Sequence, residues 1–145
     1  MNPKLEERLA AHPELGVKTM ARPFEDPYPA DAPKLDLVTL ILNYHDIAYL
    51  PVDRAKMNQH IFEALKAGGH FVVIDHSAKA GTGASVAKTL HRIDEATVLQ
   101  EVKQAGFVLV TESDFLRNPA DPREQGFFDM KGVASDKFAL RFVKP

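Results

Sequence analysis

The stretch "KLDLVTLILNYHD", residues 34–46, decides the fold. Its middle part, 35–42, is a nearly unbroken run of Leu, Val, Ile and Thr in which Asp36 is the only charged residue. Such a run lacks the alternation of a half-exposed strand and is typical of a parallel strand that helices cover on both faces. Four polar residues follow it directly: Asn43, Tyr44, His45 and Asp46. The pattern predicts a buried strand that ends in groups capable of chemistry.

The next two segments are a predicted helix and a second strand of the same design. The sequence "PVDRAKMNQHIFEALKAGG", residues 51–69, has apolar residues at helical spacing and closes with two glycines, which favour the left-handed conformation that ends a helix. "HFVVIDH", residues 70–76, is again an apolar strand, and it ends in Asp75 and His76. Because a strand, a helix and a parallel strand form a right-handed crossover, we expect both strand ends to open on one edge of the sheet.

The remaining segments complete the predicted order of elements. Helices are expected at 4–12, in the later part of 78–92 after a glycine-containing loop, and at 95–105 with Asp94 as its cap, and strands at 16–21, 107–112 and 137–143. The long loop 113–136 is of a length usually retained for function. Because "KFALRFV", residues 137–143, alternates bulky apolar residues with others, it predicts an edge strand exposed on one face.

Composition narrows the class of protein. A chain of 145 residues that is 45% hydrophobic suffices for one domain, which we predict to join an N-terminal segment, 1–34, to an α/β core, 35–145. The absence of cysteine excludes disulfides, thiolate metal sites and a cysteine nucleophile, and it suits a reducing cytoplasm. A net charge of -2 without a basic stripe, and no apolar run near the roughly 20 residues that span a bilayer, favour a cytoplasmic protein without nucleic-acid or membrane partners.

The order of elements resembles the C-terminal portion of class I S-adenosylmethionine-dependent methyltransferases, in particular a bacterial group of methyltransferase-like proteins. The motifs that carry the resemblance are "LDLVTLILNYHD", "ALKAGGHFVVIDHSAKAGTG", "LHRIDEATVLQEVKQAGFVLVTESDFLRNPADPR" and "DKFALRFVKP". The resemblance implies a truncated, Rossmann-like α/β sheet, mostly parallel, with a C-terminal antiparallel pair and helices on both faces. In the family's sheet, 35–42 would be the fourth strand and 70–76 the fifth, and the seventh strand would lie between the fifth and the sixth.

Two elements of the family's pattern are absent from this sequence. The family holds its cofactor with a glycine-rich turn after the first strand and an acidic residue after the second, whereas the only comparable cluster, "GTG" at 81–83, follows a later strand. The strand 35–42 would therefore lack its usual neighbour. We expect the sheet to be completed by a homodimer in which 35–42 pairs with its own copy, or by the N-terminal segment folding over the edge.

The resemblance also assigns roles to the residues at the end of the first strand. In the family this position lies beside the transferable methyl group, which makes Asn43, Tyr44 and His45 the candidate catalytic residues, with His45 as general base. It further makes Phe24, Asn43 and Tyr44 the candidates for contact with S-adenosylmethionine. In the alternative interpretation Asn43 and Asp46 only cap the following turn, and Tyr44 packs in the core.

Residues beyond this strand end are candidates for substrate binding. His76 ends the neighbouring strand, and Arg117 and Arg123 of the long loop are suited to bind a carboxylate or phosphate of a small molecule. The alternative for the arginines is surface ion pairing with nearby acids, namely Asp114, Asp121 and Glu124.

Three functions follow from these assignments. The first is methyl transfer to a small molecule, with S-adenosylmethionine held partly by a partner subunit. The second is a non-catalytic, self-associating protein that binds a ligand or a partner. The third is a metal-dependent hydrolase whose ligands come from the two strand ends: His45, Asp46, Asp75 and His76. Because no tight ligand spacing such as HExxH is present, the sequence by itself assigns no metal site.

Overall fold

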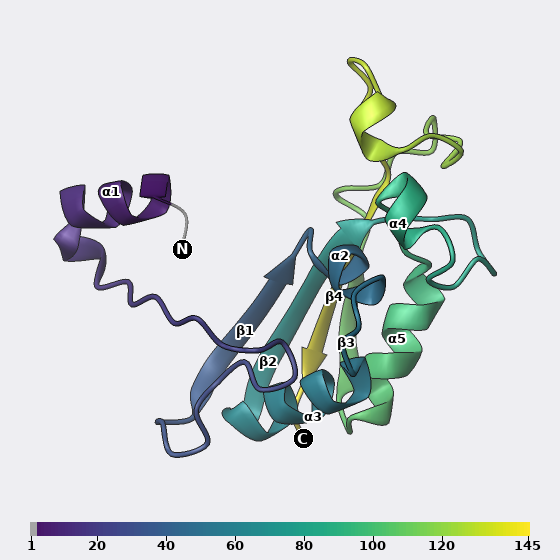
Figure 1. Cartoon of the computed structure of the whole chain (residues 1–145). Coiled ribbons are helices and arrows are strands. Elements are labelled where there is room, and N and C mark those ends of the chain that lie inside the picture. The colour runs from purple at the N-terminus through teal and green to yellow at the C-terminus, as the bar shows by residue number, and fades with distance from the viewer. Residues whose placement is uncertain (1–2) are drawn as a thin grey trace.

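A computed structural model describes residues 3–145 (Figure 1). Its strands are β1 (Leu35–Ile41), β2 (Leu65–His76), β3 (Val108–Ser113) and β4 (Lys137–Val143). Its helices are α1 (Pro3–Ala11), α2 (Tyr44–Ala48), α3 (Arg54–Ala64), α4 (Ala87–Leu90) and α5 (Glu95–Gln104), with 3-10 turns η1 (Pro13–Leu15) and η2 (Phe127–Asp129). No helix within the described range is long and apolar enough to cross a membrane.

The four strands form one mixed sheet in the order β1-β2-β4-β3. β1 and β2 are parallel, and β4 is antiparallel to both of its neighbours. This arrangement confirms the parallel pair with a closing antiparallel pair. The prediction of a mostly parallel sheet is wrong, because only the pairing of β1 with β2 is parallel. The prediction that 137–143 forms an edge strand is wrong, because β4 lies between β2 and β3. Its residue types alternate because helices cover only one side of the strand. Phe138 and Phe142 are fully buried on that side, while Arg141 points to the exposed side.

The hydrophobic core lies on a single face of the sheet, the one covered by α2, α3 and α5 (Figure 1). The buried residues that meet there are Ile47, Met57, Ile61, Phe71, Val73, Val98, Val102, Phe138, Leu140 and Phe142. On the opposite face Leu37 and Ile41 of β1 are 52% and 49% exposed. Within residues 3–145 no helix packs on that face, so the predictions of helices on both faces and of a first strand buried on both faces are wrong.

The junction between α3 and β2 also differs from the prediction. The helix ends at Ala64, and the two glycines that were expected to close it lie inside β2. Gly68 has a φ of 77°, and its N–H donates to the carbonyl of Lys144 at 2.8 Å. A Cβ on Gly69 would lie 2.9 Å from the carbonyl oxygen of Lys66. The glycines therefore permit a tight bend at the start of a strand.

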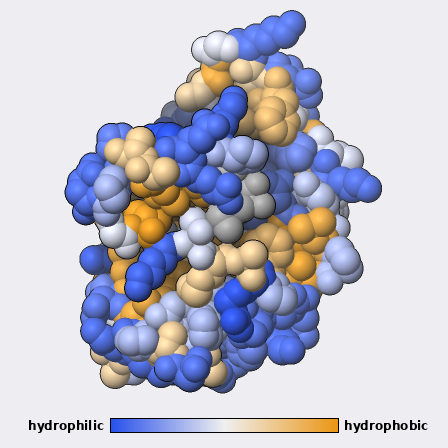
Figure 2. All heavy atoms as spheres, turned by 60° about the vertical axis from the view of Figure 1, so that its left-hand side comes forward, coloured by the Kyte–Doolittle hydropathy of each residue, from blue (hydrophilic) through white to orange (hydrophobic). Residues whose placement is uncertain are grey.

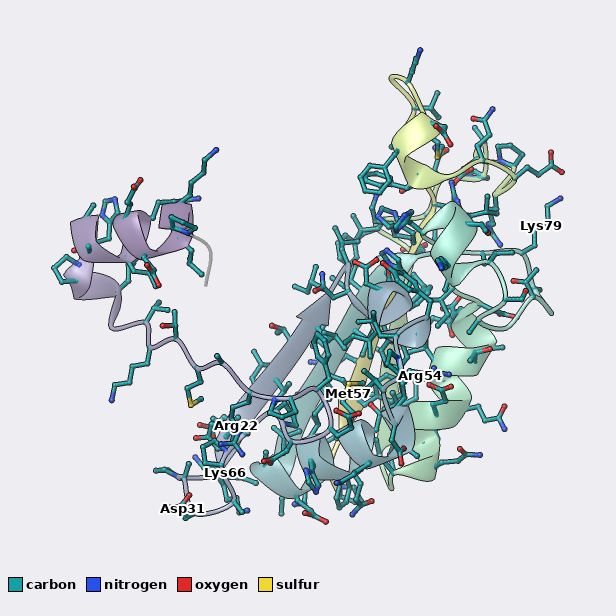
Figure 3. The ribbon with its side chains drawn as sticks, in the orientation of Figure 1. Arg22, Asp31, Arg54, Met57, Lys66 and Lys79 are labelled. Atoms are coloured by element: carbon teal, nitrogen blue, oxygen red, sulfur yellow. The ribbon has the colours of Figure 1, made fainter. Side chains whose placement is uncertain are left out.

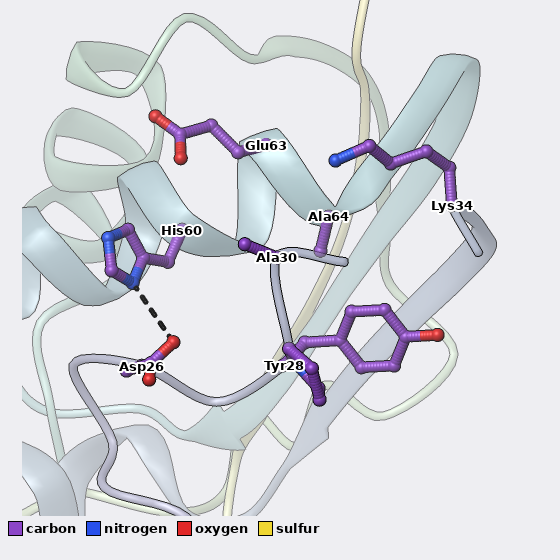
Figure 4. Close-up of a pocket in the computed structure, with 8 residues that line it drawn as sticks. Asp26, Tyr28, Ala30, Lys34, His60, Glu63 and Ala64 are labelled. Carbon is purple, nitrogen blue, oxygen red and sulfur yellow. Dashed lines mark ion pairs between the residues drawn. The ribbon is translucent and has the colours of Figure 1, made fainter. Parts of the chain in front are cut away.

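Only the Pro-rich part of the N-terminal segment packs against α3. α1 forms as predicted but buries no residue and lies apart from the sheet in Figure 1, and the strand predicted at 16–21 is absent. In the Pro-rich part, Asp26 lies 3.6 Å from the ring of His60 (Figure 4), and Glu25 accepts a hydrogen bond from the N–H of Asp53 at 3.3 Å. Among the described residues β1 pairs only with β2, so this segment leaves the other edge of β1 free.

Candidate active site

The carboxyl ends of β1 and β2 lie side by side, as the sequence predicts. At the end of β1 the chain turns sharply through Leu42, whose φ is 58° and whose N–H donates to the carbonyl of Ile74 at 2.8 Å. Positive φ is rare for a branched side chain and marks a turn held by its surroundings. The turn directs α2 across the end of β2, which brings His45 onto Asp75.

His45 and Asp75 form a buried pair at this edge. Nδ1 of His45 lies 2.6 Å from one oxygen of Asp75, and the N–H of His45 donates to the other at 2.8 Å. The opposite ring nitrogen, Nε2, lies 3.2 Å from a carboxylate oxygen of Asp46. Burial lowers the pKa of His45, but the hydrogen bond to Asp75 and the charges of Asp75 and Asp46 outweigh it, so the pKa is raised above its ordinary value.

Two further histidines complete a cluster around this pair. The ring of His76 lies 5.6 Å from that of His45, stacks on Phe127 at 4.2 Å, and places Nδ1 2.7 Å from the hydroxyl of Ser135. Burial, with help from nearby positive charge, lowers the pKa of His76 to about 4, so this ring is neutral at pH 7. His91 approaches from the other side, with its ring 5.5 Å from that of His45. His76 was a predicted site residue, whereas His91 was not.

Tyr44 and Asn43 occupy different surroundings from His45. Tyr44 is fully buried; its hydroxyl donates to Glu101 at 2.7 Å and accepts from the amide of Asn58 at 2.8 Å. Burial and the charge of Glu101 raise the pKa of Tyr44 well above its ordinary value. Arg54, which is labelled in Figure 3, binds the same carboxylate with contacts of 2.6 and 2.9 Å. Asn43 is exposed, and its amide donates to the carbonyl of Leu42 at 2.7 Å.

Of the three candidate catalytic residues, the fold therefore brings only His45 into the histidine cluster. The position of Tyr44 favours the alternative in which its side chain packs in the core and fixes α2 against α3 and α5.

The predicted cofactor residue Phe24 borders a separate, apolar cavity of about 260 Å³. Its lining comes from the Pro-rich segment, β1, α2 and α3: Phe24, Pro27, Tyr28, Leu35, Val38, Thr39, Leu40, Ile47, Met57, Ile61 and Ala64. The only polar side-chain groups in this lining are the hydroxyls of Thr39 and Tyr28, and the latter already donates to the carbonyl of Pro33 at 2.8 Å. The cavity suits the face of an aromatic base and offers no charged partner for a ribose or an amino acid.

The glycine loop at 81–83 provides no anion site either. The N–H groups of Gly81 and Gly83 point at one carboxylate oxygen of Asp94, at 2.6 and 3.5 Å. The other oxygen of Asp94 caps α5 by accepting from the N–H of Ala96 at 3.0 Å, which confirms the predicted cap. A carboxylate of the chain itself thus occupies the place that a phosphate would need.

Buried ion pairs hold the long loop over the strand ends. Arg92 is fully buried and binds Asp121 at 2.7 and 3.2 Å. Arg117 and Arg123 reach the buried carboxylate of Asp136 at 3.4 and 2.8 Å. Both arginines are thus ion-paired, but with other acids than predicted, since Asp121 binds the side chain of Arg92 and Glu124 binds that of Lys79. This network positions η2, whose phenylalanines contact the histidine cluster.

The fold is similar to those of several solved methyltransferases. A SAM-dependent methyltransferase from Thermotoga maritima matches 96% of this chain and 70% of its own length, with a TM-score of 0.60 and 16% identity. One from Clostridium acetobutylicum matches 99% and 72%, with a TM-score of 0.61 and 11% identity. The N-methyltransferase NodS from Bradyrhizobium japonicum matches 99% and 70%, with a TM-score of 0.62 and 15% identity.

No protein-family model and no curated protein sequence matches the chain. The structural similarity establishes an α/β fold of the SAM-dependent methyltransferase type.

Proposed function

We propose that the chain supplies the acceptor side of a methyltransferase site that acts on a small molecule. The observation that carries the proposal is the buried contact of 2.6 Å between Asp75 and Nδ1 of His45, at the carboxyl edge of the sheet. Ligands of open α/β sheets bind at this edge. The similarity to solved methyltransferases supports methyl transfer over other reactions that a site at this edge could catalyse.

In this proposal His45 is the proton acceptor. Asp75 holds the proton on Nδ1 and orients the ring, which leaves Nε2 to take a proton from a hydroxyl or amine of the acceptor. The side chain of Asp46 lies beside this nitrogen and is 40% exposed, so the approach to Nε2 is from the solvent side of Asp46. Because His45 must be neutral to accept a proton, methyl transfer is expected to rise with pH through its raised pKa.

The surroundings favour an acceptor with a flat, apolar body. Phe127 stacks on His76, and Phe128 meets the ring of His91 at 4.8 Å. Phe128 is 75% exposed, so an aromatic face is available next to the proton acceptor. We assign acceptor binding to these aromatic residues and not to the predicted arginines, because Arg117 and Arg123 are already bound to Asp136.

The described residues do not by themselves fit S-adenosylmethionine. They offer an apolar wall at Phe24 but no acidic group for the ribose and no free backbone N–H cluster for the amino-acid carboxylate. We therefore propose that the missing contacts come from a second copy of the chain, paired along the free edge of β1. The alternative function, a non-catalytic binding protein, requires no such contacts.

A calorimetric titration with S-adenosylmethionine and S-adenosylhomocysteine tests the cofactor part of the proposal. The expected result is saturable binding at one site per chain, and the absence of binding at millimolar ligand would leave the non-catalytic alternative. The acceptor part is tested with methyl-labelled S-adenosylmethionine and a panel of small phenols and aromatic amines. His45→Gln is expected to lower kcat by roughly 100-fold or more without changing cofactor affinity, whereas His12→Gln, at an exposed histidine, leaves both unchanged.

A further inference from the structure

Two histidines converge on a single carboxylate oxygen beside the Asp75 pair. Nε2 of His45 lies 3.2 Å, and Nδ1 of His91 lies 3.3 Å, from the same oxygen of Asp46. One possible ligand atom from each of the three residues lies within 4.8 Å of the other two. They come from α2 and from the residue that follows α4, so the fold brings together groups that are 45 positions apart in the sequence.

The number of available protons shows that this arrangement needs a further positive charge. A neutral imidazole carries one N–H, and in His45 that N–H faces Asp75. The lone pair of Nε2 then points at a carboxylate oxygen of Asp46, which also carries lone pairs. Either a second proton or a metal ion must lie between these two atoms to make the contact favourable.

We propose that His45, Asp46 and His91 form a binding site for a divalent cation of the zinc type. Tetrahedral zinc, with bonds of about 2.0–2.1 Å, places its ligand atoms about 3.3 Å apart. The separations from Asp46 to the two histidine nitrogens, 3.2 and 3.3 Å, agree with this spacing. Two imidazoles and one carboxylate favour zinc over magnesium, which prefers oxygen ligands and water.

The groups around the three ligands support the same assignment. Asp75 binds the far nitrogen of His45, which is the carboxylate–histidine arrangement that orients histidine ligands in metal sites. The hydroxyl of Tyr49 donates to Asp46 at 3.2 Å. His91 ends α4 in the left-handed conformation, with φ and ψ both 50°, which turns its ring toward Asp46.

The site is open on one side. The side chains of Asp46 and His91 are 40% and 27% exposed, which leaves a fourth position for a water molecule or an oxygen of the acceptor. Zinc would occupy the nitrogen of His45 that otherwise accepts a proton, and it strongly lowers the pKa of a bound water. The metal site does not rest on methyl transfer, because zinc affinity is measured without S-adenosylmethionine or an acceptor.

Titration of the untagged, chelator-treated protein with zinc tests this inference. A competing chromophoric chelator is expected to report one tightly bound zinc per chain. X-ray absorption of the zinc-loaded protein is expected to show two imidazole ligands. His91→Gln is expected to abolish saturable binding, and Asp75→Asn to weaken it by about 10–100-fold.

Two controls make the outcome decisive. His60→Gln changes a histidine of α3 that faces Asp26, outside the proposed site, and is expected to bind zinc as the wild type does. His91 is partly exposed, so its replacement is compatible with folding, which circular dichroism checks. Wild-type zinc affinity in His91→Gln, or saturation of the same site by magnesium alone, would overturn the inference.

Discussion

Two parts of β1 contrast sharply. The tip is the polar segment 43–46 that follows the strand, and the flank is its free edge together with the exposed face that carries Leu37 and Ile41. At the tip, His45 is buried and held between two carboxylates of the chain itself. Along its flank, Leu37 and Ile41 are about half exposed and the free edge pairs with no described residue, and Figure 2, which brings this side forward, shows hydrophobic side chains exposed among polar ones. The tip is complete within one chain, whereas the flank has the character of an unoccupied interface.

The largest expected effect comes from breaking the buried charge pairing that holds the long loop over the tip. Arg92→Met leaves the carboxylate of Asp121, which is 5% exposed, without its guanidinium partner. Removal of one partner from a buried ion pair typically costs about 3–5 kcal/mol. We expect a loss of this size in the free energy of unfolding, measured by chemical denaturation.

The matched control lies on the exposed face of the sheet. Arg141→Met removes an arginine whose contact is a hydrogen bond of 3.1 Å to the hydroxyl of Thr111, and we expect a change within about 0.5 kcal/mol. Equal stabilities of the two variants would mean that the tip is not held by its buried charges.

A smaller effect is expected at the flank. If β1 pairs with its own copy, the double variant Leu37→Lys and Ile41→Lys places charges on an apolar interface, and we expect dimerisation to weaken at least about tenfold, or about 1.4 kcal/mol. Val108→Lys, at a 51% exposed position on the opposite edge strand, is the control and should leave association unchanged. Sedimentation velocity measures both, and a wild-type chain that stays monomeric at every concentration contradicts the proposed pairing.

Local patterns predicted much of the tip and little of the flank. The parallel strand pair, the position of His45 and the cap at Asp94 follow from hydrophobic runs and capping residues within a few positions. His91 and Arg92 were missed because a His-Arg pair after a short helix has no periodic signal, and their partners, Asp46 of α2 and Asp121 of the long loop, lie about 30–45 residues away in the sequence.

The one-sided sheet was missed for a different reason. The alternation of burial in β1 is not an alternation of residue type, since Leu37 and Ile41 on the exposed face are as apolar as Val38 and Leu40 on the buried one. Hydrophobicity indicates that a surface needs cover, but it does not identify what provides the cover.

The smallest expected effect is a pH dependence at the tip. Burial opposes ionisation of Asp121, but the N–H groups of Asp136 and Arg123 and the charge of Arg92 outweigh it and lower the pKa of this carboxyl. A carboxyl whose pKa is lower in the folded state contributes stability above its ordinary pKa and loses it as pH falls toward the folded value. Because a single proton is involved, the unfolding free energy cannot change by more than about 1.4 kcal/mol per pH unit. We therefore expect the unfolding free energy of the wild type to fall more steeply below about pH 4 than that of Asp121→Asn.

Asp36→Asn, which removes an exposed carboxylate of the flank, serves as the control and should keep a stability near that of the wild type. Parallel pH profiles of the unfolding free energy for the wild type and Asp121→Asn would show that protonation of Asp121 does not cause the loss of stability in acid.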